Sequence, residues 1–237
     1  FAFKTLPDQH FPAFIHKNQE ASMTARAIDG TRIAQQIKDE IKIETEQLKH
    51  IGLVPGLAAV LVGDNPASQV YVRNKVKTCE ALGIFSEFIS LGKETTTEVL
   101  VQVIRELNKR EEVDGILVQL PLPKQIDEQA ALEEIDPAKD VDGLHPISVG
   151  NLVLGKKTLS PCTPSGVMEI LRRENVHLKG SRAVVIGRST LVGKPLAFLL
   201  LPEHATVTLC HSRTLNLPGV AREADILVAA IGRAGMV

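Results

Sequence analysis

The spacing of apolar residues along the first half of the chain predicts helices that alternate with short buried strands. Ile33, Ile37 and Ile41 recur at helical spacing and predict a helix from about Gly30 to His50. Strands that alternate with helices indicate parallel βαβ units. After the first helix, the pattern predicts a strand at 57–62, a helix that contains Tyr71 and ends at Gly83, a strand at 85–91, a helix at 95–110 and a strand at 115–119.

The second half of the chain repeats this pattern after a proline-containing segment at 159–166. We therefore expect an α/β protein of two lobes, residues 25–158 and residues 159–237, with the active site in the cleft between them. The elements predicted for the second lobe are a helix at 163–174, a strand at 182–187, a helix at 193–201 and strands at 205–210 and 225–232.

Composition narrows the class of protein. The 27 Lys and Arg residues balance 28 Asp and Glu residues, so no nucleic-acid partner is expected. No apolar run approaches the roughly 20 residues of a membrane helix, so no membrane partner is expected. Cys79, Cys162 and Cys210 lack C-x-x-C spacing, which argues against a disulfide framework or a metal site and for a reducing compartment. Each thiol is expected to be a small buried apolar group.

Residues 1–24 fit poorly with the rest of the chain and are expected to be a disordered leader or linker. Their first 22 residues lack the order of a secretory signal and contain no arginine, unlike a mitochondrial transit peptide. A cytoplasmic location is therefore expected, with the mitochondrial matrix as the alternative.

A glycine-containing loop follows the strand at 182–187. Gly187 allows a sharp turn at the end of the strand, and Gly193 would let the backbone approach a pyrophosphate at the start of a helix. The spacing is not G-x-G-x-x-G, so a plain strand-to-helix turn is the alternative.

The residues after the strand at 205–210 favour NADP over NAD. NAD-binding folds usually place a carboxylate there to bind the ribose hydroxyls. Here His211, Ser212, Arg213 and Thr214 follow the strand, and Arg188 lies in the first loop. A hydroxyl and arginines can bind a 2′-phosphate through charge-assisted hydrogen bonds, whereas an exposed polar turn is the alternative.

The first lobe carries its own candidate chemistry. Tyr71, the single tyrosine, and Lys75 share one helix face at i and i+4. Gln119 ends a predicted strand, and Asp140 and Asp142 lie in a glycine-containing loop. Taken singly, each has an ordinary alternative: a surface helix face for the Tyr–Lys pair, and turn capping for either aspartate.

Five motifs occur in order along the chain: Y-V-x-x-K, V-Q-L-P-L-P, K-D-V-D-G, P-C-T-P-x-G and G-R-S-x-x-V-G-K-P. With these motifs the chain closely resembles the bifunctional methylenetetrahydrofolate dehydrogenase/methenyltetrahydrofolate cyclohydrolase family, from about Ala27 to Val237. The resemblance implies a folate-binding catalytic lobe, a Rossmann-type NADP-binding lobe that is incomplete at its C-terminus, and a homodimer.

The resemblance also implies roles for individual residues. Tyr71 would stack on the folate, and Lys75 would be the catalytic group. Gln119 would contact and tune Lys75, and Asp142 would hydrogen-bond the pterin ring. The full set expected to bind substrate is Tyr71, Val72, Arg73, Asn74, Lys75, Val118, Gln119, Leu120 and Asp142, with Lys75, Gln119 and Asp142 as the catalytic residues; the set expected to bind NADP is Gly187, Arg188, Ser189, Ser212 and Arg213.

The implied activity is oxidation of 5,10-methylenetetrahydrofolate with NADP⁺, followed by hydrolysis of the methenyl product to 10-formyltetrahydrofolate. Two alternatives stay open at this point. One is another two-lobe NADP dehydrogenase that acts on a small acid, and the other is a non-catalytic or weakly active folate- or NADP-binding fragment.

Overall fold

The computed structural model describes residues 25–232, so the predicted leader at 1–24 lies outside the described residues. The chain divides into two compact units. We call Thr31–Pro161 the first lobe, and residues 25–30 together with 162–232 the second lobe. The predicted α/β architecture of two lobes is confirmed, and each lobe is described by itself.

The first lobe is built on a parallel sheet with the strand order β2-β1-β3. Its first strand lies in the middle, so the two crossover helices, α2 and α3, cover opposite faces. Its elements are α1 (Gly30–His50), β1 (Gly56–Val62), α2 (Pro66–Ala81), β2 (Phe85–Leu91), α3 (Thr97–Lys109), β3 (Gly115–Val118), α4 (Glu128–Glu133) and α5 (Pro146–Val153).

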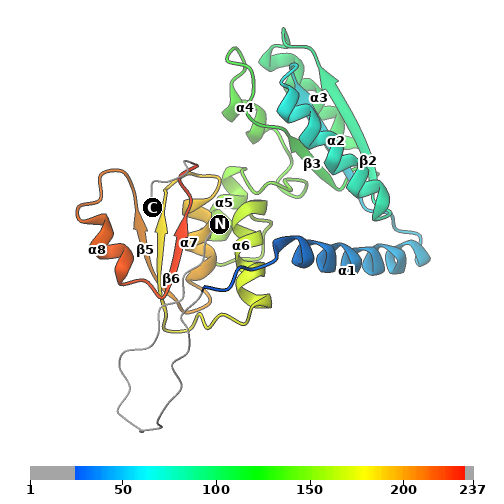
Figure 1. Cartoon of the computed structure of the whole chain (residues 1–237). Helices are drawn as coiled ribbons and strands as arrows, with labels where there is room; N and C mark the ends of the chain where they lie inside the picture. The colour runs from blue at the N-terminus through cyan, green and yellow to red at the C-terminus, as the bar shows by residue number, and fades with distance from the viewer. Residues whose placement is uncertain (1–24, 233–237) are drawn as a thin grey trace, which may run out of the picture. The chain divides into compact units, whose positions relative to one another are not determined.

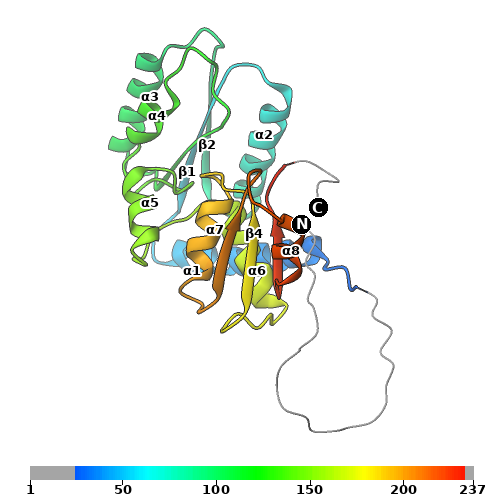
Figure 2. The same ribbon diagram turned by 90° about the vertical axis from the view of Figure 1, so that its left-hand side faces the viewer.

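Alternate residues of β1 enter two different apolar clusters, as expected for a strand covered on both faces. Ala58, Val60 and Val62 pack with buried residues of α3 and α4. Ala59 points the other way and packs with Val72 of α2. Figure 2 shows α2 on one side of β1 and β2, and α3 with α4 on the other side.

The second lobe repeats this arrangement with the strand order β5-β4-β6, again parallel. Alternate residues of β4 pack on α6 and α7 on one face and on α8 on the other. Figure 1 shows α8 on the other side of the sheet from α6 and α7. The elements are α6 (Cys162–Arg173), β4 (Arg182–Ile186), α7 (Gly193–Leu200), β5 (Thr206–Cys210), α8 (Leu217–Arg222) and β6 (Ile226–Ala229).

Three short helices were not predicted from the apolar pattern: α4, α5 and α8. Each has six or eight residues, too few for a helical period to stand out. Their starts carry caps, because Asp127, His145 and Asn216 each accept a backbone N–H of the first turn. Helix α6 begins at Cys162, inside the segment expected to separate the lobes.

Within residues 25–232, no helix is both long and apolar enough to span a bilayer.

Candidate active site

Helix α2 presents the Tyr71–Lys75 pair. The Asn65 side chain accepts the N–H groups of Ala67 and Ser68, and Pro66 occupies the first helical turn, so the helix start is well defined. Val72 is fully buried against the sheet. Its burial turns the neighbouring face, with Tyr71 and Lys75, away from the core.

The predicted pairing of Tyr71 with Lys75 is present in the structure. Lys75 Nζ lies 4.9 Å from the centroid of the Tyr71 ring, within cation–π range. The Tyr71 side chain is 53% exposed. Among the residues that the structure describes, no carboxylate forms an ion pair with Lys75. The exposed ring can therefore be reached by a ligand, and Lys75 is partly buried beside it.

The K-D-V-D-G loop, residues 139–143, reaches the same face of the sheet through Val141. Val141 packs in the apolar cluster that also holds Val72 and Val76 of α2. Its position depends on Gly115 of β3, where a Cβ atom would lie 2.4 Å from Val141 Cγ1. Asp142, the next residue of the loop, is partly buried.

Asp142 is the group of this site whose pKa is clearly shifted from its ordinary value. Burial raises the pKa of its carboxyl group, the positive charge of Lys75 opposes that rise, and the negative charge of Asp140 adds to it. Because the charge of Lys75 acts on Asp142, these two predicted residues lie within electrostatic range of each other.

Gln119 lies where the sequence places it, directly after the buried strand β3. Its backbone N–H donates to Val60 O at 2.8 Å, which holds it beside the carboxyl end of β1. Its side-chain Nε2 donates to Leu120 O at 2.7 Å. In residues 25–232 no hydrogen bond joins Gln119 to Lys75, so the expected contact between them stays a prediction.

The other residues expected to bind folate differ in exposure. Val72 and Val118 are buried in the core, so their side chains support the site from within. Arg73 and Asn74 are exposed, and Leu120 is half-buried.

The loop from 187 to 193 in the second lobe has the tight geometry that its glycines suggest. Gly187 has a φ of +123°, and a Cβ there would lie 2.3 Å from Ala230 O. At Gly193 a Cβ would lie 1.9 Å from Gly187 O. The absence of a side chain at Gly193 is therefore needed for packing of the loop on itself, a reason additional to the expected approach of a pyrophosphate.

Ser189 closes this loop over the start of α7. Its Oγ accepts the N–H of Val192 at 3.1 Å and that of Gly193 at 3.4 Å. Its carbonyl accepts the N–H of Lys194 at 3.0 Å. Ser189 thus satisfies N–H groups that a helix start leaves without partners.

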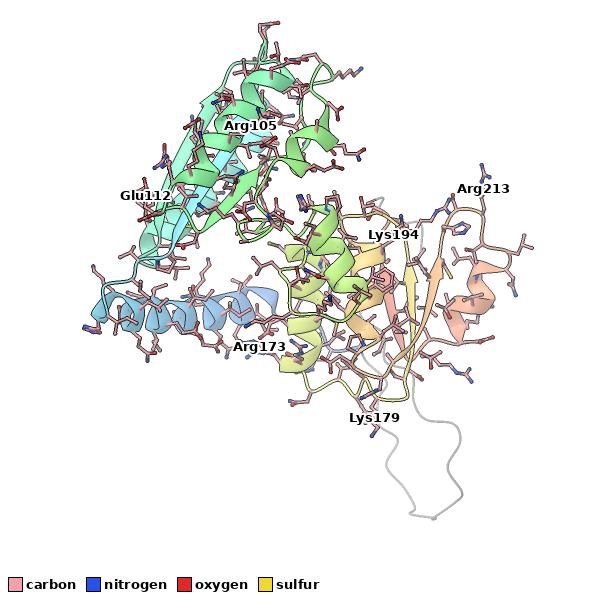
Figure 3. The ribbon with its side chains drawn as sticks, turned by 180° about the vertical axis from the view of Figure 1, so that it is seen from behind. Arg105, Glu112, Arg173, Lys179, Lys194 and Arg213 are labelled. Atoms are coloured by element: carbon pink, nitrogen blue, oxygen red, sulfur yellow. The ribbon has the colours of Figure 1, made fainter. Side chains whose placement is uncertain are left out.

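The ends of β4 and β5 lie side by side, because Gly187 N donates to Cys210 O at 2.8 Å. Arg188, Ser212 and Arg213 follow these ends and are exposed. The turn after β5 is held by His211, whose N–H donates to Thr214 Oγ1 at 2.8 Å. Figure 3 shows Arg213 in the loop between β5 and α8, and Lys194 at the start of α7.

One expectation about the cysteines is wrong. Cys210 is buried as expected, but Cys79 is only partly buried and Cys162 is exposed. Cys162 is exposed because it begins α6, whose buried residues are Pro164, Val167, Met168 and Leu171. Burial raises the pKa of the Cys79 thiol, and the charge of Lys75, one turn earlier, opposes this. In the described part of the chain, no group of three His, Cys, Asp or Glu residues could hold a metal ion.

Sequence reasoning gave less weight to Asp140 and did not single out His145. Asp140 is only 2% exposed, and its Oδ2 accepts the N–H of His145 at 2.9 Å. The expectation of turn capping therefore describes Asp140. Asp142, by contrast, lies within range of the Lys75 charge.

The fold and these two sets of residues define a class: a two-lobe α/β protein with a tight glycine-containing loop between a strand and a helix on one lobe and a Tyr–Lys–Asp cluster on the other. Comparison with family models agrees. The catalytic domain of tetrahydrofolate dehydrogenase/cyclohydrolase matches residues 28–142, and the NAD(P)-binding domain of the same family matches residues 161–237. The chain belongs to the tetrahydrofolate dehydrogenase/cyclohydrolase family, as its motifs predicted.

Curated relatives carry the name "Bifunctional protein FolD". The protein from Koribacter versatilis is 56% identical over 215 residues, which are 91% of this chain and 70% of that protein. The protein from Halalkalibacterium halodurans is 53% identical over 212 residues, which are 90% of this chain and 76% of that protein.

Solved structures show the same fold. The FolD methylenetetrahydrofolate dehydrogenase/cyclohydrolase of Campylobacter jejuni superposes with a TM-score of 0.86 at 45% identity, over 88% of this chain and 74% of that one. The Trypanosoma brucei enzyme, solved with NADP cofactor and an inhibitor, gives a TM-score of 0.85 at 41% identity, over 90% of this chain and 74% of that one.

Proposed function

We propose that this protein oxidises 5,10-methylenetetrahydrofolate to 5,10-methenyltetrahydrofolate with NADP⁺ and hydrolyses the methenyl product to 10-formyltetrahydrofolate. The observation that carries the proposal is the joint placement of Tyr71, Lys75 and Asp142 on one face of the first lobe. Membership of the family and the names of relatives at 50–56% identity support both activities.

In this proposal Tyr71 is the platform for the folate. Its ring is half exposed and already holds the Lys75 ammonium group over its face. A flat heterocycle can stack on the same ring. Asp142 hydrogen-bonds the pterin ring, and Gln119 lies at the carboxyl end of β3, where ligands gather in parallel sheets.

Lys75 is the acid/base of the hydrolysis. The methenyl bridge is cationic, and attack by water requires that a proton be removed from the water and transferred onward. An amine held beside the bridge can do this, and the partly buried position of Lys75 limits its contact with solvent. Formation of the methenyl group is mainly a matter of positioning, since the nicotinamide ring supplies the hydride acceptor.

NADP is proposed as the cofactor of the second lobe. The residues present fit a 2′-phosphate: Arg188, Ser212 and Arg213 are exposed at the joined ends of β4 and β5. The turn from 211 to 214 contains no carboxylate that would repel a phosphate. The T. brucei structure with NADP, at 41% identity, supports this choice.

A homodimer and a cytoplasmic location complete the proposal. The homodimer rests on the resemblance to the family, and the bacterial FolD relatives support the cytoplasmic location.

The test is a pair of assays on the same preparation. NADPH formation from methylenetetrahydrofolate measures the dehydrogenase, and loss of methenyl-folate absorbance measures the cyclohydrolase. Both rates should be well above those of the uncatalysed reactions. Turnover of a small hydroxy acid instead would support the alternative dehydrogenase, and binding of folate and NADP without turnover would support a non-catalytic protein.

A further inference from the structure

Asp140 is a buried acid in the loop that carries Asp142. It is 2% exposed, and its backbone pairs with Ile116 of β3 through an isolated parallel bridge. Within residues 25–232 no lysine or arginine forms an ion pair with it. A buried carboxylate that lacks a cationic partner costs free energy, and an asparagine could cap the same turn without that cost.

The Asp140 side chain closes the turn in which Asp142 lies. Its Oδ2 accepts the N–H of His145 at 2.9 Å, five residues later, and its carbonyl accepts the N–H of Gly143 at 3.4 Å. Gly143 has a φ of +63°, and a Cβ there would lie 2.7 Å from Leu159 O, so the far side of the turn is also fixed.

The closing partner, His145, is itself held in place. Its Nδ1 accepts the N–H of Ile147 at 3.0 Å, and its Nε2 lies 3.2 Å from Glu133 O. A ring that accepts at Nδ1 and donates at Nε2 is the neutral tautomer. The turn from Asp140 to His145, which contains Asp142, is thus anchored at both ends.

We propose that Asp140 is a positioning residue for Asp142: its carboxylate closes the turn that presents Asp142 to Lys75, and it places a second negative charge beside Asp142. The inference rests on the proposed function, because Asp142 matters to catalysis only if folate binds beside it.

The charge has a chemical consequence. The charged groups that act on Asp142 are Lys75 from α2 and Asp140 from its own loop, while the packed segments at 115–116 and 159–160 contribute no ionisable side chain. Burial and Asp140 both raise the pKa of Asp142. A protonated carboxyl can donate one hydrogen bond and accept another, whereas a carboxylate only accepts. By raising this pKa, Asp140 moves upward the pH at which Asp142 loses its donor and becomes an acceptor only.

The experiment compares Asp140→Asn with Asp136→Asn in the full chain. Asp136 is an exposed aspartate four residues earlier whose Oδ1 also accepts a backbone N–H, that of Ala138 at 2.8 Å. Carboxyl ¹³C NMR of aspartate-labelled protein follows Asp142, whose signal is assigned by its loss in Asp142→Asn. We expect Asp140→Asn to lower the pKa of Asp142, and Asp136→Asn to leave it unchanged.

Kinetic measurements separate the role of Asp140 in closing the turn from the effect of its negative charge. Asparagine can still accept the His145 N–H, so Asp140→Asn should change the KM for methylenetetrahydrofolate by less than about 3-fold. Asp140→Ala loses the acceptor as well and should raise KM by roughly 10- to 100-fold, the factor expected for a lost hydrogen bond to a charged group. Unchanged titration of Asp142 in Asp140→Asn, or an unchanged KM in Asp140→Ala, would overturn the inference.

If Asp140→Asn does not fold, Asp140→Glu gives the same separation, because it keeps the charge and displaces the oxygen by one methylene. A raised KM with the titration of Asp142 retained supports the inference, and an unchanged KM overturns it. The titration needs no folate, so lack of both activities in the unaltered protein would count against the proposed function and leave the result on Asp140 standing.

Discussion

The two lobes share one sheet topology but build their sites differently. In each, the first strand lies between the second and the third, and candidate residues follow the carboxyl ends of strands. In the first lobe the candidate residues alternate with core residues: Val72 follows Tyr71, and Val141 precedes Asp142. In the second lobe Arg188, Ser212 and Arg213 stand on exposed loops, and only the glycines are packed tightly.

This difference shows in which lobe a change at a candidate residue would also affect the stability of the fold. Changes at the exposed residues proposed to bind NADP should alter affinity while the fold is kept. Changes in the first lobe act on residues whose direct neighbours form the core. The loop glycines of the second lobe are the exception, because their backbone contacts leave no space for a side chain. The comparison can be tested at four positions.

The largest effect is expected at Lys75. Lys75→Met keeps much of the volume of the stem and removes the amine, so hydrolysis of methenyl-folate should fall by roughly 10²- to 10⁴-fold, the range for loss of a general acid or base. Lys77→Met, an equal change at an exposed position of the same helix, is the control and should retain activity. Near-normal hydrolysis in a folded Lys75→Met protein would remove Lys75 from the mechanism.

The next largest effect is expected at Arg188, one of the exposed candidate residues of the second lobe. Arg188→Ala should weaken NADP⁺ binding more than NAD⁺ binding, by about 1.5–3 kcal/mol, because a charge-assisted hydrogen bond to the 2′-phosphate is lost. Arg182→Ala, at the opposite end of β4, is the matched control. Affinities for both cofactors can be measured by titration calorimetry. Equal losses for NADP⁺ and NAD⁺ would assign Arg188 to the pyrophosphate or to the fold.

The third effect tests the tightly packed glycines. Gly193→Ala places a Cβ 1.9 Å from Gly187 O and should destabilise the protein by about 1–3 kcal/mol, the usual cost of overpacking. Gly166→Ala in α6 meets no atom within 4 Å and should be neutral or stabilising. Urea unfolding measures both variants. Equal stability of the two variants would show that the loop can relax around a methyl group.

The smallest effect concerns pH and Asp142. Its pKa is raised above the ordinary value of 3.8, so its contribution to stability is fully present below 3.8 and is lost as pH rises through the raised value. Asp142→Asn should therefore gain stability relative to the unaltered protein as pH rises through this window. Urea unfolding at several pH values measures the free energy of unfolding of Asp142→Asn and of the unaltered protein. Asp64→Asn, a change at an exposed position, is the control. A difference in unfolding free energy between the two proteins that does not change with pH would contradict the raised pKa of Asp142.

The sequence was sufficient for the sheets and the larger helices, because buried strands and amphipathic helices leave periodic patterns. The short helices α4, α5 and α8 were missed, although Asp127, the pair His145–Pro146 and Asn216 carry readable start signals. These signals were outweighed by the lack of a periodic run.

The site was predictable in part. The cation–π pair follows from i and i+4 spacing on one helix, a local relation. The approach of Asp142 to Lys75 depends on packing of Val141 with Val72, residues 69 positions apart (141 − 72), so helical spacing alone could not reveal it. Bonding of the Gln119 amide to Leu120 O likewise depends on the local path of the chain after β3, which motif spacing does not encode.

The Ser189 hydroxyl has a consequence for the protein between catalytic cycles. Because its oxygen accepts the amides of Val192 and Gly193, these N–H groups at the start of α7 have a hydrogen-bond partner within the chain itself. The hydrogens of these two amides should exchange slowly with solvent even in the cofactor-free protein. The loop would then stay ordered when NADPH leaves. The next NADP⁺ would bind without the entropy cost of ordering the loop.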